Sequence, residues 1–254
     1  MDMQSVLTVN GLYGGYLYRK PVIRNLTFSV GKGEMVGLVG LNGAGKSTTI
    51  KHILGLMEPE EGEIRVNGVT LREEGTTYHS SIAFVPESPE LYEELTIREH
   101  LELTARVYGL SREEYEERAE QLMRLFRMTE RAGSFSRHLS KGMRQKVMLM
   151  NAFLIQAPLY IIDEPFLGLD PLGIRSLLEL MASFKQKGCS FLISSHILST
   201  IEKYCDRYVV LERGEMAARG TLEEIRTQAG LPVGATLDDV FFHLVGGSGE
   251  GGGL

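Results

Sequence analysis

The chain has few cysteines, no long apolar run and no excess of positive charge, and each shortage excludes a class of protein. Its two cysteines, Cys189 and Cys205, lack the spacing of a metal or redox motif. No apolar stretch approaches the roughly 20 residues that cross a bilayer, and the N-terminus shows no signal segment. The net charge of -6, without a Lys/Arg run, disfavours a nucleic-acid partner. We therefore expect a cytoplasmic globular protein that needs another polypeptide for any work on a membrane.

Apolar periodicity predicts an α/β fold built around a parallel sheet. Strand patterns are expected at residues 6–16, 22–30, 35–40, 159–163 and 190–194, and helical patterns at 47–56 and 174–186. The first two strands, separated by turn residues, indicate an antiparallel β edge. The helix between the last two strands gives the βαβ order of a parallel sheet. An Asn-Gly turn predicts a hairpin at 63–71, and a second hairpin is expected at 208–220.

Composition divides the chain into four parts. A core with the β edge is expected at residues 1–88 and 157–220. Residues 89–156 are predicted to form a helical subdomain, because apolar residues recur there with a helical period. Two helices are predicted within 221–245. The Gly-rich stretch 246–254 has no apolar face and is predicted to be flexible.

A glycine-rich segment after the strand at 35–40 matches a phosphate-binding loop. It runs from Gly40 to Ser47 in the order Gly, four residues, Gly, Lys and Ser, and a helix follows. Its amides can surround a β-phosphate, Lys46 supplies charge to the β and γ oxygens, and the Ser47 hydroxyl can ligate Mg²⁺. A plain glycine-rich turn is the alternative. The predicted nucleotide contacts are Gly40, Asn42, Gly43, Ala44, Gly45, Lys46, Ser47 and, at the α-phosphate, Thr48.

Two carboxylates end the apolar strand at 159–163. Asp163 is placed to hold Mg²⁺, and Glu164 to orient or deprotonate the water that attacks the γ-phosphate. An acidic pair at a strand end is often solvated surface, but its pairing with a phosphate loop favours catalysis. The two motifs together predict an enzyme that hydrolyses a nucleoside triphosphate with Mg²⁺ as its metal, and the resemblance described next implies that the nucleotide is ATP.

Residues 138–146, HLSKGMRQK, lie between these motifs and resemble the signature of the ABC ATPase family, which opens a helix. The resemblance implies a P-loop NTPase fold with a RecA-like parallel-sheet core, an antiparallel β edge and a helical subdomain. In that family the signature serine and second glycine contact the γ-phosphate bound by the opposite subunit. Ser140 and Gly142 would thus act in trans in a homodimer, although alone Ser140 is an ordinary helix N-cap. Lys141 and Met143 replace the family's first glycine and glutamine.

Other residues follow the order of the same family. Residues 168–170 resemble the dimer-contact loop, and His196 resembles the histidine that touches the γ-phosphate. Tyr16 resembles the aromatic residue that stacks on adenine, with Tyr13 and Tyr18 as competitors. The predicted catalytic residues are Glu164, His196 and Lys46.

Glu87 stands where the family has a glutamine that touches Mg²⁺ and the attacking water. A glutamate can still ligate metal but cannot donate a hydrogen bond when ionised. The resemblance therefore implies Glu87 as a metal ligand beside Ser47 and Asp163, and the alternative is a loop carboxylate that points into solvent. The surface expected to meet a membrane partner lies around Leu91, Tyr92 and Thr96.

Within the family, residues 86–96, 135–147 and 160–171 look most like the ATP-binding subunits of bacterial Ecs-type exporters. Those subunits pair with a multi-spanning permease, EcsB, and are associated with peptide export and protein secretion. The resemblance implies an EcsB-like permease, which would hold this chain at the cytoplasmic face of the membrane. A cytosolic switch ATPase without a permease and an importer motor are the alternatives.

Overall fold

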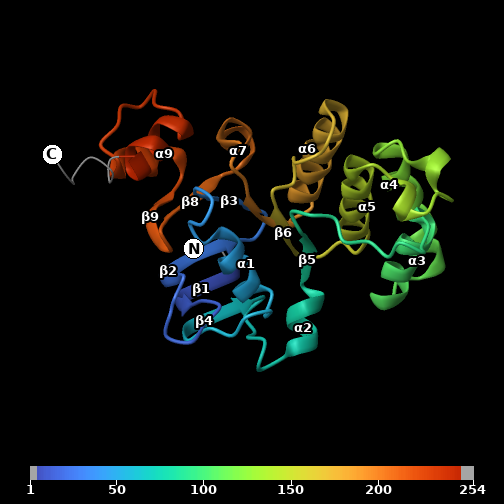
Figure 1. The fold of residues 1–254 in the computed structure, drawn as a ribbon, viewed down its shortest axis with the longest axis horizontal. Coiled ribbons are helices and arrows are strands. Elements are labelled where there is room, and N and C mark those ends of the chain that lie inside the picture. The colour runs from blue at the N-terminus through green and yellow to red at the C-terminus, as the bar shows by residue number, and fades with distance from the viewer. Residues whose placement is uncertain (1–4, 247–254) are drawn as a thin grey trace.

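Two sheets form the framework of the structure, a computed structural model that describes residues 5–246 (Figure 1). A three-stranded antiparallel sheet has the order β2-β1-β4. A six-stranded sheet has the order β5-β6-β7-β3-β8-β9 and is parallel except for the β8-β9 hairpin. The strand bounds are β1 Ser5–Gly14, β2 Ile23–Gly31, β3 Met35–Val39, β4 Glu61–Val66, β5 Ile82–Val85, β6 Leu159–Asp163, β7 Ser190–Ser194, β8 Arg207–Glu212 and β9 Glu215–Gly220.

Some helices connect the strands, and three others form a separate group at one end of the molecule. Figure 1 shows α3, α4 and α5 together at the end opposite α9. The helix bounds are α1 Lys46–Ile53, α2 Gly75–Ser80, α3 Ile97–Val107, α4 Arg112–Leu125, α5 Lys141–Leu154, α6 Pro171–Gln186, α7 Leu198–Tyr204, α8 Leu222–Gln228 and α9 Leu237–Gly246. In residues 5–246 no helix is both long enough and apolar enough to cross a membrane.

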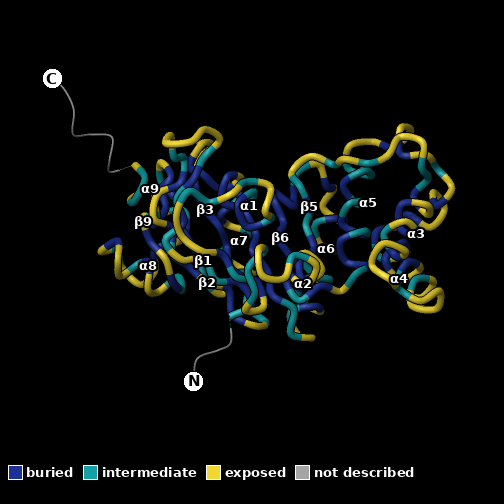
Figure 2. Tube along the Cα trace, turned by 90° about the horizontal axis from the view of Figure 1, so that it is seen from below, coloured by how far each residue is buried: buried dark blue, intermediate teal, exposed yellow. Residues whose placement is uncertain are grey.

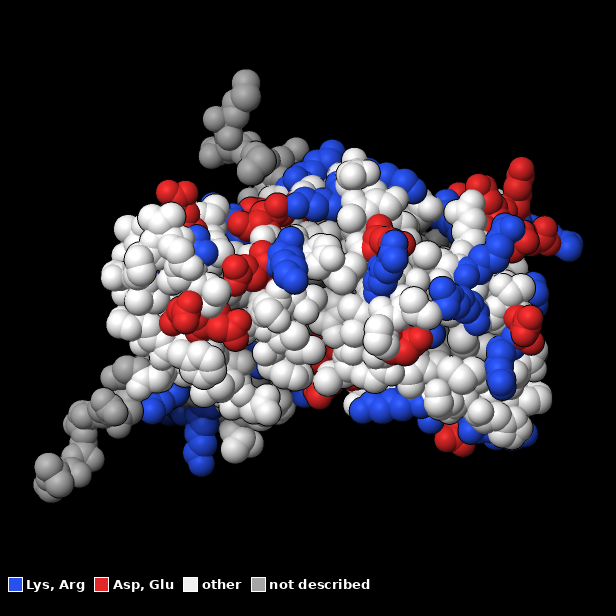
Figure 3. All heavy atoms as spheres, turned by 90° about the horizontal axis from the view of Figure 1, so that it is seen from above, with Lys and Arg blue, Asp and Glu red and all other residues white. Residues whose placement is uncertain are grey.

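Polar caps fix where the first two helices of this group begin. Thr96 and Ser111 precede α3 and α4, and each exchanges hydrogen bonds with a glutamate three residues later, Glu99 and Glu114. These capping boxes satisfy amides that a helix start leaves without partners. On the exposed faces of α3 and α4, arginines pair with glutamates four residues away. Acidic and basic side chains are accordingly interspersed over this end of the molecule (Figure 3).

Two apolar cores lie on opposite faces of the six-stranded sheet. One core joins the helical group to the sheet, through Val147 and Phe153 of α5 and Ile162 of β6. Within it Tyr160 stacks between Phe153 and Phe191, with ring centroids 4.7 and 5.0 Å apart. The other core fills the space between this sheet, α1 and the antiparallel sheet. Figure 2 shows burial along the strands and exposure at the connecting turns. Because α5 shares a core with the sheet, displacement of either disturbs the packing of both.

The hairpin expected at 63–71 is shorter than the sequence suggested. Asn67 and Gly68 form its turn with φ of 49° and 82°, and Val66 and Val69 bond to each other across it. The returning arm ends at the single bridge to Val69, and the next N–H, of Thr70, donates to the Glu73 carboxylate instead of to β4. β4 pairs along its other edge with β1. The hairpin expected at 208–220 is confirmed as β8-β9.

The C-terminal boundary also differs from expectation. The flexible tail was expected from residue 246, but Gly246 is the last residue of α9. The rest of that stretch, 247–254, lies outside the described residues.

Candidate active site

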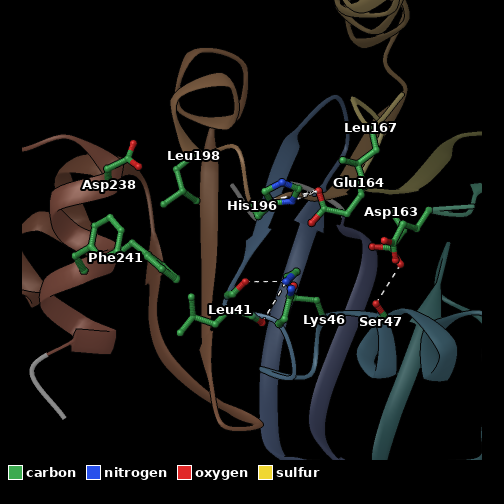
Figure 4. Close-up of a pocket in the computed structure, with 14 residues that line it drawn as sticks. Leu41, Lys46, Ser47, Asp163, Glu164, Leu167, His196, Leu198, Asp238 and Phe241 are labelled. Carbon is green, nitrogen blue, oxygen red and sulfur yellow. Dashed lines mark hydrogen bonds and ion pairs between the residues drawn. The ribbon is translucent and has the colours of Figure 1, made fainter. Parts of the chain in front are cut away.

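The ends of three neighbouring parallel strands border a cavity of about 350 Å³ (Figure 4). β7 lies between β6 and β3, so the carboxyl ends of these strands meet at one edge of the sheet. In open α/β sheets such an edge is where ligands bind, because loops distant in sequence converge there. The cavity brings together these predicted residues: Gly40, Asn42, Lys46, Ser47, Glu87, Asp163, Glu164 and His196.

The segment after β3 folds as a loop that leads into α1. Gly43 and Gly45 have φ of 81° and 109°, and a Cβ on Gly45 would lie 2.7 Å from Cδ1 of Ile23. Gly45 precedes α1 without a side-chain cap, which leaves the first amides of the helix for an anion. Lys46 is 7% exposed, and its Nζ donates to the Gly40 carbonyl at 2.7 Å. The loop therefore offers the amides and the positive charge that phosphate groups require.

Asp163 ends β6 as a buried carboxylate with two hydroxyl partners. The Ser47 hydroxyl donates to Oδ2 at 3.2 Å, and the Ser194 hydroxyl donates to Oδ1. Strand register sets the second contact, because Asp163 pairs with Ser194 across β6 and β7. No group of three or more His, Cys, Asp and Glu side chains in residues 5–246 could hold a metal alone. A hydroxyl beside a carboxylate nevertheless fits Mg²⁺, which commonly completes its ligands with waters and substrate phosphates.

Glu164 adopts a left-handed backbone conformation, with φ of 49°. Residues other than glycine keep this conformation only where their surroundings hold it, which is common in functional sites. Its N–H donates to the carbonyl and hydroxyl oxygens of Ser194, at 3.1 and 3.2 Å. Its Oε2 accepts from the His196 N–H at 3.3 Å and lies 2.8 Å from the ring Nδ1. The carboxylate and the imidazole are thereby held together at the cavity (Figure 4).

Tyr16 lies beside the loop but is not among the residues that line the cavity. Its side chain is 60% exposed, and Nζ of Lys51 lies over the ring at 5.0 Å and donates to the phenol oxygen at 3.2 Å. Hydrogen bonds with Thr48, and then with Lys51, lower the pKa of the Tyr16 phenol. Both partners belong to α1, so Tyr16 sits on the helix that follows the phosphate loop.

The signature residues lie at the start of α5, and they too are absent from the described lining of the cavity. Ser140 is the N-cap of α5, and its hydroxyl accepts from the Met143 N–H at 3.3 Å. Its side chain stays exposed, so another molecule can reach it. Gly142 packs directly on another loop, since a Cβ there would overlap the carbonyl oxygen of Gly168.

Two parts of the site are not predicted from the sequence. Ser194 contacts the Asp163 carboxylate and the Glu164 backbone N–H, and its local signal is its place at a strand end, two residues before His196. The helix α9 adds Asp238, Phe241 and Phe242 to the cavity wall (Figure 4). No local spacing links α9 to the phosphate loop, because tertiary packing brings them together.

A sequence profile described as ABC transporter matches residues 23–167. The chain belongs to this family. The ABC-type transporter ATP-binding protein EcsA of Bacillus subtilis (strain 168) is 55% identical over 94% of this chain and 96% of its own length. The SkfA peptide export ATP-binding protein SkfE of the same organism is 34% identical, over 76% of this chain and 80% of its own length. A solved structure described as an ATP binding subunit of an ABC transporter has a TM-score of 0.91 and 55% identity, covering 94% of this chain and 99% of that one.

Family membership confirms the fold class expected from the sequence. The protein is an ABC transporter ATP-binding subunit and an ATPase.

Proposed function

We propose that ATP is hydrolysed in this cavity with each polar side chain in a defined role. Glu164 takes the proton of the attacking water, and His196 orients that carboxylate and contacts the γ-phosphate. Lys46 and the loop amides bind the β- and γ-phosphates. Tyr16 stacks on adenine, which its exposed ring beside α1 supports.

Ser47 and Asp163 are the proposed Mg²⁺ ligands, joined by Glu87, which follows β5 and lines the same cavity. Bound Mg²⁺ would neutralise charge on the phosphate oxygens. The observation that carries the proposal is a single hydrogen-bond network that includes both carboxylates, made by Ser47, Asp163, Ser194, Glu164 and His196.

A second copy of the chain completes the ATP site in this proposal. Ser140 and Gly142 belong to an exposed helix start outside the cavity lining of their own chain. A helix N-terminus offers amides to anions, so the same turn can contact the γ-phosphate of a facing subunit. The two subunits would close head to tail around two ATP molecules, and hydrolysis would release them.

The permease would contact the loop before α3. The backbone of Tyr92 is held on both sides, because its N–H donates to His100 Nε2 at 3.0 Å and its carbonyl accepts from the Ser136 hydroxyl at 2.6 Å. Its side chain is nevertheless 65% exposed. An aromatic ring displayed on a fixed backbone loses little entropy when a partner covers it. The adjacent Leu91 and Thr96 extend the same surface.

Export by an EcsB-like permease is the proposed output. The identity to EcsA supports the permease type, and the similarity to SkfE, named for peptide export, supports a peptide or secretion-related cargo. Through that permease the subunit would lie at the cytoplasmic face of the membrane. No described residue needs to touch the cargo, so cargo choice belongs to the permease.

Co-expression of the tagged chain with an EcsB-like permease from the same organism tests the partner. We expect a complex that survives detergent purification and hydrolyses ATP faster than the free subunit. Tyr92→Ala should weaken co-purification more than Tyr204→Ala, which truncates an exposed tyrosine at the end of α7. Equal recovery of both variants would remove Tyr92 from the interface, and no complex at all would favour a permease-free switch ATPase.

Direction is tested with inside-out membrane vesicles that contain the complex. Export predicts ATP-dependent accumulation of labelled peptides inside such vesicles, and none with Glu164→Gln. Accumulation in right-side-out vesicles alone would indicate an importer.

A further inference from the structure

The signature turn, which contains Ser140 and Gly142 at the start of α5, contacts the segment that follows Glu164 in the same chain. Lys146, on the second turn of α5, forms an ion pair with Asp170, with Nζ and Oδ1 2.9 Å apart. The Lys146 side chain is 15% exposed and that of Asp170 is 52% exposed, so the lysine end of the pair is shielded from solvent and the aspartate end is open to it. The hydrogen bond from Lys146 is the main reason that the pKa of Asp170 lies below its usual value.

Two glycines allow this close approach. Gly142 lies against the Gly168 carbonyl so closely that a Cβ would overlap the oxygen. A Cβ on Gly173 would lie 2.7 Å from Asp170 Oδ1 and 3.1 Å from Lys146 Cε. The backbone contact of Gly142 with Gly168 therefore depends on the absence of a side chain, and the ion pair lies against Gly173.

The segment between Glu164 and Asp170 is itself folded tightly. The N–H of Leu167 donates to the Glu164 carbonyl at 3.2 Å, and that of Leu169 donates to the Phe166 carbonyl at 3.4 Å. Phe166 and Leu169 are buried in the core that also contains α5. The Lys146–Asp170 pair thus joins α5 to a compact segment anchored beside the catalytic glutamate.

We propose that Lys146 is a positioning residue for the ATP site of the facing subunit: through Asp170 it fixes the signature turn at Ser140 and Gly142. This inference rests on the proposed composite site. Phosphate contacts lose effect steeply when misplaced by about 1 Å, so loosening this turn lowers turnover. Glu164 keeps its own bonds to Ser194 and His196, so its position does not depend on Lys146.

A dimer with one live site tests the proposal. Two variants of the chain are mixed. The base chain, which supplies the proposed base Glu164 to the live site, carries Ser140→Arg. The signature chain, which supplies Ser140 to that site, carries Lys46→Ala. The intact site then takes Lys46 and Glu164 from the first chain and Ser140 from the second. Lys146→Met, which keeps the apolar stem and removes the charge, is placed on one chain or on the other.

We expect Lys146→Met on the signature chain to lower kcat by about tenfold, as for loss of a charged hydrogen bond, with little change in KM for ATP. The same change on the base chain should leave turnover of the live site unchanged. Lys146→Arg should restore most of the activity. Asp170→Asn should give the same asymmetry, and it serves if Lys146→Met folds poorly.

The outcomes separate the inference from the proposed function. No activity in the mixture before Lys146 is changed, with mixed dimers shown to form, would reject the composite site itself. Activity in that mixture, with equal losses whichever chain carries Lys146→Met, would show a general structural role and overturn the inference.

Discussion

The two groups of residues proposed to bind ATP lie in different surroundings. Around the cavity, Lys46, Asp163 and Glu164 are each 7% exposed and bonded to neighbours of the same chain. At the start of α5, Ser140 is exposed and its hydroxyl accepts a local hydrogen bond from the Met143 N–H. The first group is held in place by hydrogen bonds within its own chain, and fixed polar groups of this kind are what electrostatic catalysis requires. The second group presents a surface, and in our proposal a second copy covers it.

The largest loss of activity is expected in the first group, when the proposed base Glu164 is replaced. Glu164→Gln should lower ATP turnover by about 10²-fold or more, because the amide cannot take a proton from water while phosphate and metal contacts remain. Phosphate release at saturating MgATP measures the effect. Glu93→Gln, at an exposed carboxylate outside the cavity lining, is the control. Near-normal hydrolysis in Glu164→Gln would remove Glu164 from its catalytic role.

Ser194→Ala tests whether the hydrogen bonds that hold the first group in place matter for turnover. Ser194→Ala removes a hydroxyl that contacts Asp163 and the Glu164 N–H, so we expect kcat to fall about tenfold or more. The neighbouring Ser195 is also fully buried, but its hydroxyl accepts from the Ile197 N–H instead. Ser195→Ala is therefore the matched control. Equal kcat for the two variants would mean that the Ser194 hydroxyl does not organise the carboxylates.

Tyr16 resembles the second, exposed group, since its ring is exposed although its phenol contacts α1. Tyr16→Ala should weaken ATP binding about tenfold, because stacking on a base contributes about 1–3 kcal/mol. Tyr16→Phe keeps the ring and should bind ATP almost as well as the parent chain. Tyr18→Ala, at a ring 78% exposed, is the control. If Tyr18→Ala weakens binding and Tyr16→Ala does not, Tyr18 is the adenine contact.

Glu87 shares a property with each group: it lines the cavity, like the first group, and it is exposed, like the second. Two like charges about 4 Å apart cost roughly 1–4 kcal/mol at surface dielectrics, so a carboxylate beside the γ-phosphate opposes metal-free ATP. We expect Glu87→Gln to retain hydrolysis, bind metal-free ATP more tightly and need a few-fold more Mg²⁺ for half-maximal turnover. Titrations of ATP binding without metal and of turnover against Mg²⁺ check both shifts. Two unchanged curves would place Glu87 away from the metal.

The sequence predicted the parts of the fold and site whose signal is local. The phosphate loop and the two carboxylates at the end of β6 follow short patterns beside apolar strands, and the structure brings Gly40, Asn42, Lys46 and Ser47 of that loop into one cavity with both carboxylates. The role of Ser194 depends on the register between β6 and β7, which spacing along the chain does not encode. The contact of Gly142 with Gly168, and the place of α9 in the cavity wall, arise from packing between distant segments. Local patterns therefore identify chemistry, while tertiary contacts decide how it is held.

In our proposal, each chain supplies the cavity of one ATP site and offers Ser140 and Gly142, at the start of α5, to the site of the other chain. The mass of Glu164→Gln in solution, measured by light scattering with and without MgATP, tests it most directly. We predict a dimer with MgATP and a monomer without it. Adding Ser140→Arg should leave a monomer that still binds ATP, since the cavity of its own chain is intact. A Glu164→Gln, Ser140→Arg chain that dimerises with MgATP as well as Glu164→Gln alone would contradict the claim.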